Sequence, residues 1–307
     1  MRHYGPMDPS DIIEYLRPLP VTKGYYLVLG GGKIGTSFTE HARKHRFPLV
    51  LVVDNDRNAA ASSGAEIIED AHCLRKLLEE KLSSPLEQES SHIYFYSSEL
   101  NEVPFILSFG IPEYIVPAIP CHVAAYLVKE YLNSSNNEQT VTEMCISPEK
   151  KDMIQFFDQF ASHFPKNIIA GLYPAQGIAM LSYARPGEIC PDGCPGPEDF
   201  CSNFRREKTK TITSYVRGLL PWMNGWVFES YQMKPGIGAM KGADMKRNLL
   251  EMYEYMRFID ASDDKIHDMD TTKDVFFIAT TCNCHGVVNL FRTYARDESK
   301  FNKPIMK

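Results

Sequence analysis

The sequence has no long apolar run. None of its 307 residues belongs to a stretch approaching the roughly 20 apolar residues that span a bilayer, so no membrane span is expected. Residues 1–6 lack the apolar core of a signal peptide, which predicts a cytoplasmic protein. With 44% hydrophobic and 23% charged residues, the composition is that of a globular protein, and the length suits two domains.

An excess of positive charge is also missing. The formal net charge of −6 gives no overall attraction to phosphate backbones, so no nucleic-acid partner is expected. The basic run at 205–210 is short and is interpreted as a solvated face.

Several familiar catalytic patterns are absent. The chain contains no G-x-S-x-G, H-E-x-x-H, P-loop or deaminase pattern, and no C-x2-C knuckle of the kind that holds structural zinc. The acid-rich stretch 260–270 lacks the spacing of a calcium loop and is interpreted as solvated. Function therefore has to be inferred from two other features, a glycine loop and a group of cysteines.

The glycine loop follows a β-rich apolar run, Tyr25–Leu29, and fits G-x-G-x-x-G through Gly30, Gly32 and Gly35. The first glycine permits a tight turn, the second lets a pyrophosphate approach the backbone, and the third lets the next helix pack closely. That helix is predicted over residues 33–44, beginning at Lys33, with the positive end of its dipole toward the phosphates.

An acidic residue ends the next predicted strand, 48–53. Asp54 would accept hydrogen bonds from the adenosine ribose and repel a 2′-phosphate, which favours NAD over NADP. The alternative is a loop that only makes a tight turn beside an empty pocket.

The segment after Asp54 carries a resemblance to a known family. Asp54-Asn-Asp56-Arg57 precedes a predicted third strand, Gly64-Ala-Glu-Ile-Ile-Glu-Asp70. Over about residues 24–72 the chain resembles the TrkA-N (RCK-type) nucleotide-binding domain. The resemblance implies a Rossmann fold that binds NAD(H) or an adenine nucleotide at Gly30, Gly32, Gly35 and Asp54. The chain beyond residue 72 does not resemble the ligand-sensing companion domain of that family.

The remaining pattern predicts an α/β protein of two units. We expect a lead-in at 1–23, a Rossmann-like parallel sheet at 24–135, and a second α/β domain at 141–307. The first unit includes a strand at 104–109 and a proline-punctuated loop at 110–120. In that region Glu113 and His122 are candidate pocket residues, although a buried histidine at a helix start is more often structural.

The second unit places three loops after predicted strands, at 185–201, 233–242 and 281–285, before a last helix at 286–296. If these strands are parallel, all three loops emerge at one sheet edge. The middle loop, with Gly236 and Gly238, either binds an anion or forms a flexible turn.

Five of the eight cysteines occupy two of these loops, in the spacing C-x3-C-x6-C and then C-x-C-H. Four thiolates suit an iron–sulfur cluster or Zn2+, and Cys-Pro steps stiffen the loop. The predicted ligands are Cys190, Cys194, Cys201 and either Cys282 or Cys284, with all of them in one coordination sphere. The alternatives are buried thiols or a disulfide, or a nucleophilic Cys282 or Cys284 with His285 as base. A histidine next in sequence points away from its neighbour, so that base would have to come from elsewhere.

These features lead to two functional hypotheses. The first is an NAD-dependent oxidoreductase that passes electrons or hydride between the nucleotide and the cysteine-held centre. It would serve a small-molecule or protein redox partner, with Cys282, His285 and His122 as catalytic candidates, and could form a homodimer. The second is a non-enzymatic sensor of nucleotide or redox state with a structural zinc.

Overall fold

The structure is a computed structural model. It describes residues 16–86, 91–134, 139–146, 149, 151–185, 187–191, 194–262 and 275–295. Most of the lead-in at 1–23 and most of the acid-rich stretch at 260–270 lie outside these ranges.

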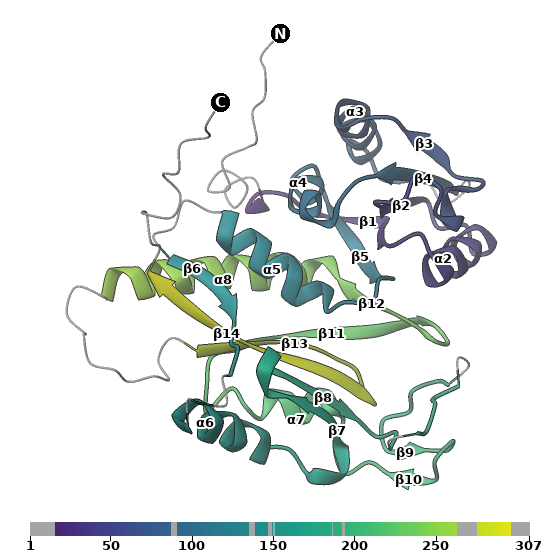
Figure 1. The fold of residues 1–307 in the computed structure, drawn as a ribbon. Coiled ribbons are helices and arrows are strands. Elements are labelled where there is room, and N and C mark those ends of the chain that lie inside the picture. Colours follow the sequence, from purple (N-terminus) through teal and green to yellow (C-terminus); the bar gives the residue numbers. More distant parts are fainter. Residues whose placement is uncertain are drawn as a thin grey trace.

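The first half of the chain forms five parallel strands (Figure 1). They are β1 (Val21–Leu29), β2 (Leu49–Asp54), β3 (Glu66–Ile68), β4 (His92–Ser97) and β5 (Ile111–Pro117), in the spatial order β3-β4-β2-β1-β5. Strands β2, β3 and β4 lie on one side of β1, and β5 lies on its other side. The strand order therefore reverses between β1 and β5. Strand β4 lies beside β2, and the short β3 lies at the sheet edge.

Four helices connect these strands or follow them: α2 (Lys33–Lys44), α3 (Ala71–Leu82), α4 (Val103–Leu107) and α5 (Val123–Ser134). The predicted bounds of α2 agree with the structure. The strand predicted at 104–109 is wrong because this run forms α4, and the predicted loop at 110–120 contains β5. The prolines of β5 were misleading: Pro112 and Pro117 both lie within the strand.

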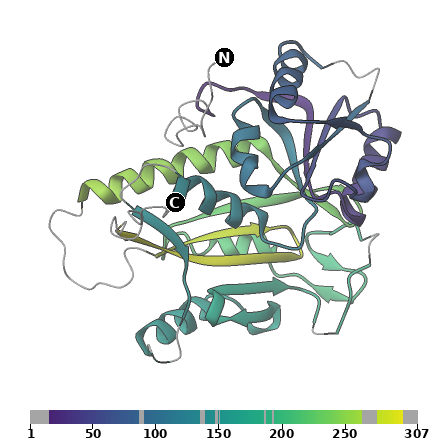
Figure 2. The same ribbon diagram turned by 45° about the horizontal axis from the view of Figure 1, so that its top comes forward.

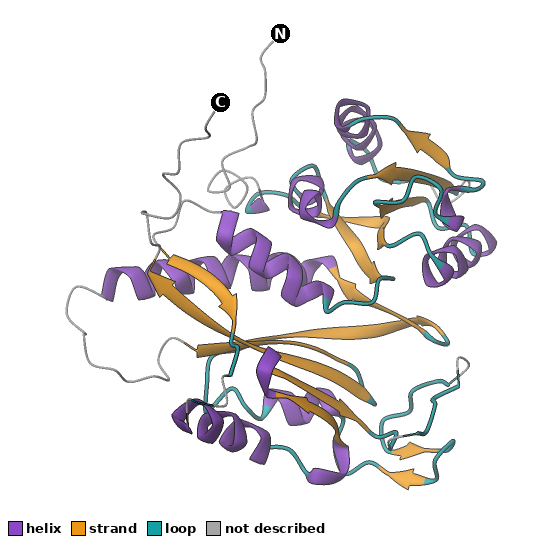
Figure 3. Ribbon diagram, in the orientation of Figure 1, coloured by secondary structure: helices purple, strands orange, loops and turns teal. Residues whose placement is uncertain are grey.

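The second half is mostly antiparallel. Its strands in the main sheet are β6 (Gln139–Glu143), β7 (Ile169–Tyr173), β8 (Ile178–Ser182), β11 (Gly225–Lys234), β12 (Ile237–Lys241), β13 (Val275–Thr281) and β14 (His285–Ala295). The helices are α6 (Lys151–Ser162), α7 (Ile212–Arg217) and α8 (Gly242–Ser262), and a separate two-stranded hairpin joins β9 (Phe200–Cys201) to β10 (Arg206–Glu207). Figure 3 shows the predominance of strands in this half.

Both halves share one mixed sheet of 12 strands. Strand β12 joins them, because Met240 pairs with Ile115 of β5 while β12 also forms a hairpin with β11. The fold is therefore mixed α/β. A separate sheet was expected in each of the two units, but the strands of both form one continuous sheet.

The helix predicted at 286–296 is wrong, since this segment is the central strand β14. It pairs with β13, β8 and β6. Both of its faces are covered, because Phe291 belongs to one hydrophobic cluster and Val288 and Leu290 belong to another. A strand buried on both faces loses the alternation that distinguishes strand from helix in a sequence.

Helices cover both faces of the sheet (Figures 1 and 2). On one face, side chains of α3, α4, α5 and α8 join the largest hydrophobic cluster. On the other face, α2 packs over the parallel strands, while α6 and α7 pack over β8, β13 and β14. The sheet is therefore an interior layer that exposes loops mainly at its edges.

Strand direction decides which loops meet. Strand β11 is parallel to β13, and β8 and β13 are both antiparallel to β14, so β8, β11 and β13 run in the same direction. The antiparallel pairs of β12 with β5 and β11 give the parallel strands of the first half this direction too. The glycine loop after β1 and the three unusual loops of the second half therefore leave the sheet at the same edge.

Candidate functional site

The glycine loop is held tightly to the sheet. Gly30 has φ +110°, a left-handed conformation that favours glycine, and its N–H donates to Val53 O at 2.8 Å. A Cβ at Gly30 would lie 2.6 Å from Ile119 Cγ2, so the loop after β5 also packs against it.

The other two glycines of the motif differ in what surrounds them. A Cβ on Gly35 would collide with the Gly30 carbonyl oxygen, so this glycine allows α2 to pack against the loop. A Cβ on Gly32 would meet no atom within 4 Å, and Gly32 and Lys33 are exposed at the start of α2. The loop is therefore closed on its sheet side and open at Gly32.

The Asp54 carboxylate braces the loop. Its Oδ2 accepts from Gly31 N–H at 2.5 Å, and its Oδ1 accepts from Asp56 N–H at 2.8 Å. These are charge-assisted bonds, which are the stronger class. A carboxylate has room for about four hydrogen bonds, so Asp54 can still accept from a hydroxyl.

The predicted loop at 233–242 is a β-hairpin connection. Residues on both sides of Pro235-Gly236 belong to β11 and β12, and Gly236 has φ +82°, which explains the glycine. Lys234 Nζ donates to Ser37 Oγ at 2.7 Å, so the hairpin contacts the helix that follows the glycine loop. Strand β12 occupies much of the segment predicted as a loop, and α8 begins directly after it at Gly242.

The hairpin also borders a pocket of about 510 Å³. Four of the five clustered cysteines line it: Cys190, Cys194, Cys282 and Cys284. His285, Gln232 and Gly238 are also among the lining residues. Tertiary structure thus brings the two cysteine groups, some eighty residues apart, to one cavity.

The turn between β13 and β14 sets two of these side chains side by side. Cys282 N–H donates to His285 O at 2.8 Å, which closes the turn, and Cys282 Sγ lies 3.9 Å from His285 Nδ1. The expectation that a base would have to come from elsewhere overlooked this turn, which places residues i and i+3 across from each other. Burial, followed by the charge of Lys208, lowers the pKa of His285.

Cys284, which lines the same pocket, is buried. Lys208 Nζ donates to Cys284 Sγ at 2.8 Å and to Pro197 O, and lies 5.6 Å from the centre of the Tyr183 ring. Burial raises the pKa of the Cys284 thiol, and the Lys208 ammonium opposes that shift.

Lys208 has the burial of a core residue, with 5% of its surface exposed. No carboxylate of the described residues forms an ion pair with it. The interpretation of 205–210 as a solvated face was wrong for Lys208 and also for Arg206, which pairs with Glu188. A short basic run gives no signal of such burial.

The remaining cysteines of the first loop are close neighbours. Burial, then a hydrogen bond with Cys194 and the proximity of Cys284 and Cys201, raise the pKa of the Cys190 thiol to about 11. Cys201 is buried in β9, beside Arg206 of β10. The side chains do not form a completed ligand sphere: within the described ranges, no three His, Cys, Asp or Glu residues are grouped so as to hold a metal ion.

The other predicted pocket residues lie elsewhere. His122 has both ring nitrogens hydrogen-bonded, Nδ1 to Asn289 Oδ1 and Nε2 to Thr280 Oγ1, each at 2.8 Å. Burial lowers its pKa to about 4. Glu113 accepts from Gly24 N–H at 2.6 Å, near the other end of β1. Both contacts are structural.

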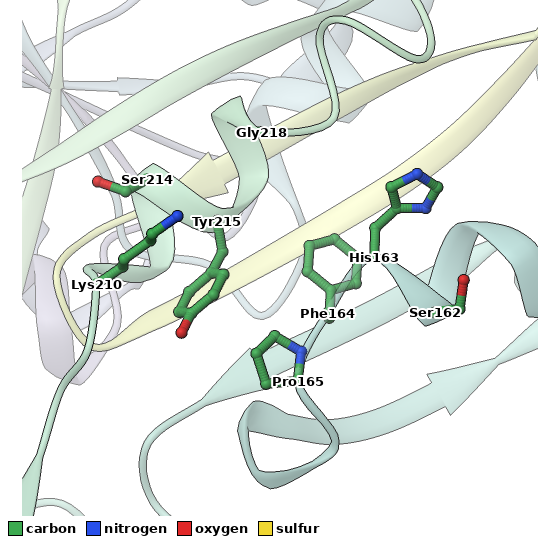
Figure 4. A pocket seen from close by; sticks show the side chains of 8 residues that line it. All are labelled: Ser162, His163, Phe164, Pro165, Lys210, Ser214, Tyr215 and Gly218. Atoms are coloured by element: carbon green, nitrogen blue, oxygen red, sulfur yellow. The ribbon is translucent and has the colours of Figure 1, made fainter.

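A second pocket of about 410 Å³ lies between the end of α6 and α7 (Figure 4). Lys210, Ser214 and Tyr215 stand on one side, with His163 on the other. His163 is held by Gln159 O at 2.9 Å and packs on Trp222 with ring centres 4.5 Å apart. The pocket does not contact the glycine loop or the cysteines, so we do not assign it chemistry.

One comparison with known proteins covers most of this chain. A protein of Archaeoglobus fulgidus named "Uncharacterized protein" is 23% identical over 266 residues, which cover 87% of this chain and 98% of that protein. No match to the TrkA-N family was found for residues 24–72, and the strands of this segment belong to a mixed sheet, so that resemblance was wrong. No helix among the described residues has the length and apolar character to cross a membrane.

Residues 124–294 match the family AF_1314_C, described as "Uncharacterized protein, C-terminal domain". The matched segment runs from α5 to β14 and contains all five clustered cysteines and Lys208, while the glycine loop lies before it. Because this segment is more than half of the chain, the protein belongs to the AF_1314_C family.

Proposed function

We propose that this protein binds NAD(H) at the Gly30–Gly35 loop and exchanges electrons or hydride with a centre in the cysteine-lined pocket. The observation that carries the proposal is the position of the glycine loop. It follows β1 at the point where the strand order reverses, with β2 on one side and β5 on the other. Ligands of open α/β sheets bind outside the carboxyl ends of strands at such a reversal.

The form of the loop supports a phosphate ligand there. The open side of Gly32 leaves the backbone approachable, and α2 directs its N-terminal N–H groups toward the same space. No side chain caps this helix end.

Asp54 supports NAD over NADP. Its carboxylate lies beside the loop, and a 2′-phosphate would bring a second negative charge toward it. The ribose hydroxyls of NAD can instead donate to the lone pairs that Gly31 and Asp56 leave available.

The common sheet edge supports a link between nucleotide and thiols. The β11–β12 hairpin contacts α2 through Lys234 and Ser37 and borders the cysteine pocket through Gln232 and Gly238. A nucleotide extending along this edge from the glycine loop would therefore approach the pocket across one hairpin.

Calorimetric titration with NADH, NAD+, NADPH and ATP tests the nucleotide, and NADH oxidation with artificial electron acceptors tests the chemistry. We expect NAD(H) to bind more tightly than NADPH and the acceptors to be reduced. Asp54→Asn should reduce the preference for NADH over NADPH. Absence of NAD(H) binding refutes the proposal. Tight binding without turnover favours the alternative, a sensor that uses the same loop.

A further inference from the structure

We propose that Cys190, Cys194, Cys201 and Cys284 hold a thiophilic transition-metal ion, iron or zinc, and that Lys208 stabilises the loaded site. Cys282 is excluded from the ligand set and remains a reactive thiol beside His285. This inference deepens the cysteine centre of the proposed function, but it does not depend on nucleotide binding.

The mutual arrangement of the sulfurs supports the four ligands. Cys190, Cys194 and Cys284 line one pocket, and Cys201 is close enough to affect the Cys190 thiol. In a tetrahedral thiolate site with metal–sulfur bonds of about 2.3 Å, the sulfurs are about 3.8 Å apart. Because three of the four cysteines already line one cavity, we expect rotations of their side chains to bring the sulfurs to this separation.

The turn between β13 and β14 selects Cys284 over Cys282. Cys284 is buried and receives the Lys208 hydrogen bond. Cys282 is more exposed and lies against His285. Burial and the Lys208 hydrogen bond therefore favour Cys284 as the ligand, while Cys282 keeps its contact with His285.

Lys208 supplies the charge that such a site needs. Four thiolates and a divalent ion form a dianion, which is costly to bury without a counter-charge. Lys208 is buried, has no carboxylate partner among the described residues, and already donates to one of the four sulfurs. N–H donors to metal-bound sulfur of this kind contribute to affinity from outside the ligand set.

Hydrogen bonds attach the loop that carries Cys190 and Cys194 to the strands beside it. Cys194 N–H donates to Pro191 O at 3.0 Å, and Gln232 Nε2 donates to Cys194 O at 2.7 Å, which attaches the loop to β11. Asn283 Nδ2 donates to Gly196 O at 3.0 Å and joins the two cysteine segments directly. These hydrogen bonds hold Cys194 and Gly196 beside β11 and the turn before β14.

Cobalt(II) is the probe, because tetrahedral thiolate coordination gives it charge-transfer and visible ligand-field bands. We expect the reduced full-length protein to bind one Co2+ with the intense spectrum of four thiolates. Alkylation with iodoacetamide, followed by peptide mass spectrometry, should show that Co2+ protects the four ligands and leaves Cys282 reactive. This measurement uses the wild-type chain, so it does not depend on whether a variant folds.

Variants complete the test. Cys284→Ser should abolish the four-thiolate spectrum, whereas Cys282→Ser and a triple serine variant of the exposed cysteines should keep it. Those exposed cysteines are Cys73, Cys121 and Cys145. Lys208→Met should weaken the apparent affinity by about 10- to 100-fold at neutral pH. Its far-UV spectrum serves as the folding control.

Several results would overturn the inference. They are failure of the wild type to bind Co2+, protection of Cys282 in place of Cys284, loss of binding in the triple variant, or unchanged affinity in folded Lys208→Met. Metal analysis of anaerobically purified protein separates this inference from the proposed function. Bound iron supports both the metal site and the proposed redox function. Bound zinc supports the metal site but contradicts electron transfer through it.

Discussion

Gly32→Ala separates a phosphate-binding loop from a loop that only turns the chain. Gly32 has φ −73° and ψ −156°, an extended conformation that alanine adopts without strain, and a Cβ there meets no protein atom within 4 Å. The substitution should therefore change the free energy of unfolding by no more than about 1 kcal/mol in either direction, since lower backbone entropy is offset by a poorer helix cap.

The effect on NADH should be far larger. A Cβ projects about 1.5 Å from the backbone, which is enough to push a phosphate oxygen out of hydrogen-bond range of the loop N–H groups. Each hydrogen bond to a charged group contributes about 1.5–3 kcal/mol, so losing one corresponds to about 10- to 150-fold in the dissociation constant.

Calorimetric titration with NADH and urea denaturation of the same samples measure the two effects. Glu40→Gln is the matched control, because Glu40 is an exposed residue in the middle of α2 and should leave affinity unchanged. If Gly32→Ala folds normally and binds NADH as the wild type does, the open face of the loop is not where the pyrophosphate lies.

Three further substitutions test the structure around the site. Gly35→Ala should destabilise the fold by about 2–3 kcal/mol in urea denaturation, because its Cβ collides with the Gly30 carbonyl; an unchanged midpoint would contradict the packing of α2. The pKa of His122, about 4, lies below its unfolded value of about 6.5. Above pH 6.5 the free energy of unfolding should therefore contain the full contribution of neutral His122. It should fall by about 3 kcal/mol as the pH drops toward 4. His122→Gln should flatten that part of the profile, and an equally steep profile would assign it to other groups. Arg206→Gln, which removes the ion pair with Glu188 beside the cysteine loop, should cost about 1 kcal/mol and speed alkylation of Cys190; unchanged kinetics would show that the pair does not hold the loop.

The local pattern of the sequence was sufficient for the glycine loop. Strand, loop, helix and acidic strand end follow one another within about 30 residues, and each is set by contacts between near neighbours in the chain. The bounds of α2 and the position of Asp54 at the end of β2 agree with expectation for this reason. The same signals gave no information about the order of more distant strands, and the resemblance to TrkA-N that was inferred from them was wrong.

Tertiary structure decided the remainder. Whether 285–295 forms helix or strand depended on its burial between two layers of helices, and β12 became a strand because β5 and β11 offered unpaired edges on both sides. The neighbourhood of Lys208, Cys284 and the Cys190–Cys194 pair likewise exists only because β8, β11 and β13 share a direction. The sequence alone determined which thiols and glycines were available, whereas long-range strand pairing determined which of them meet.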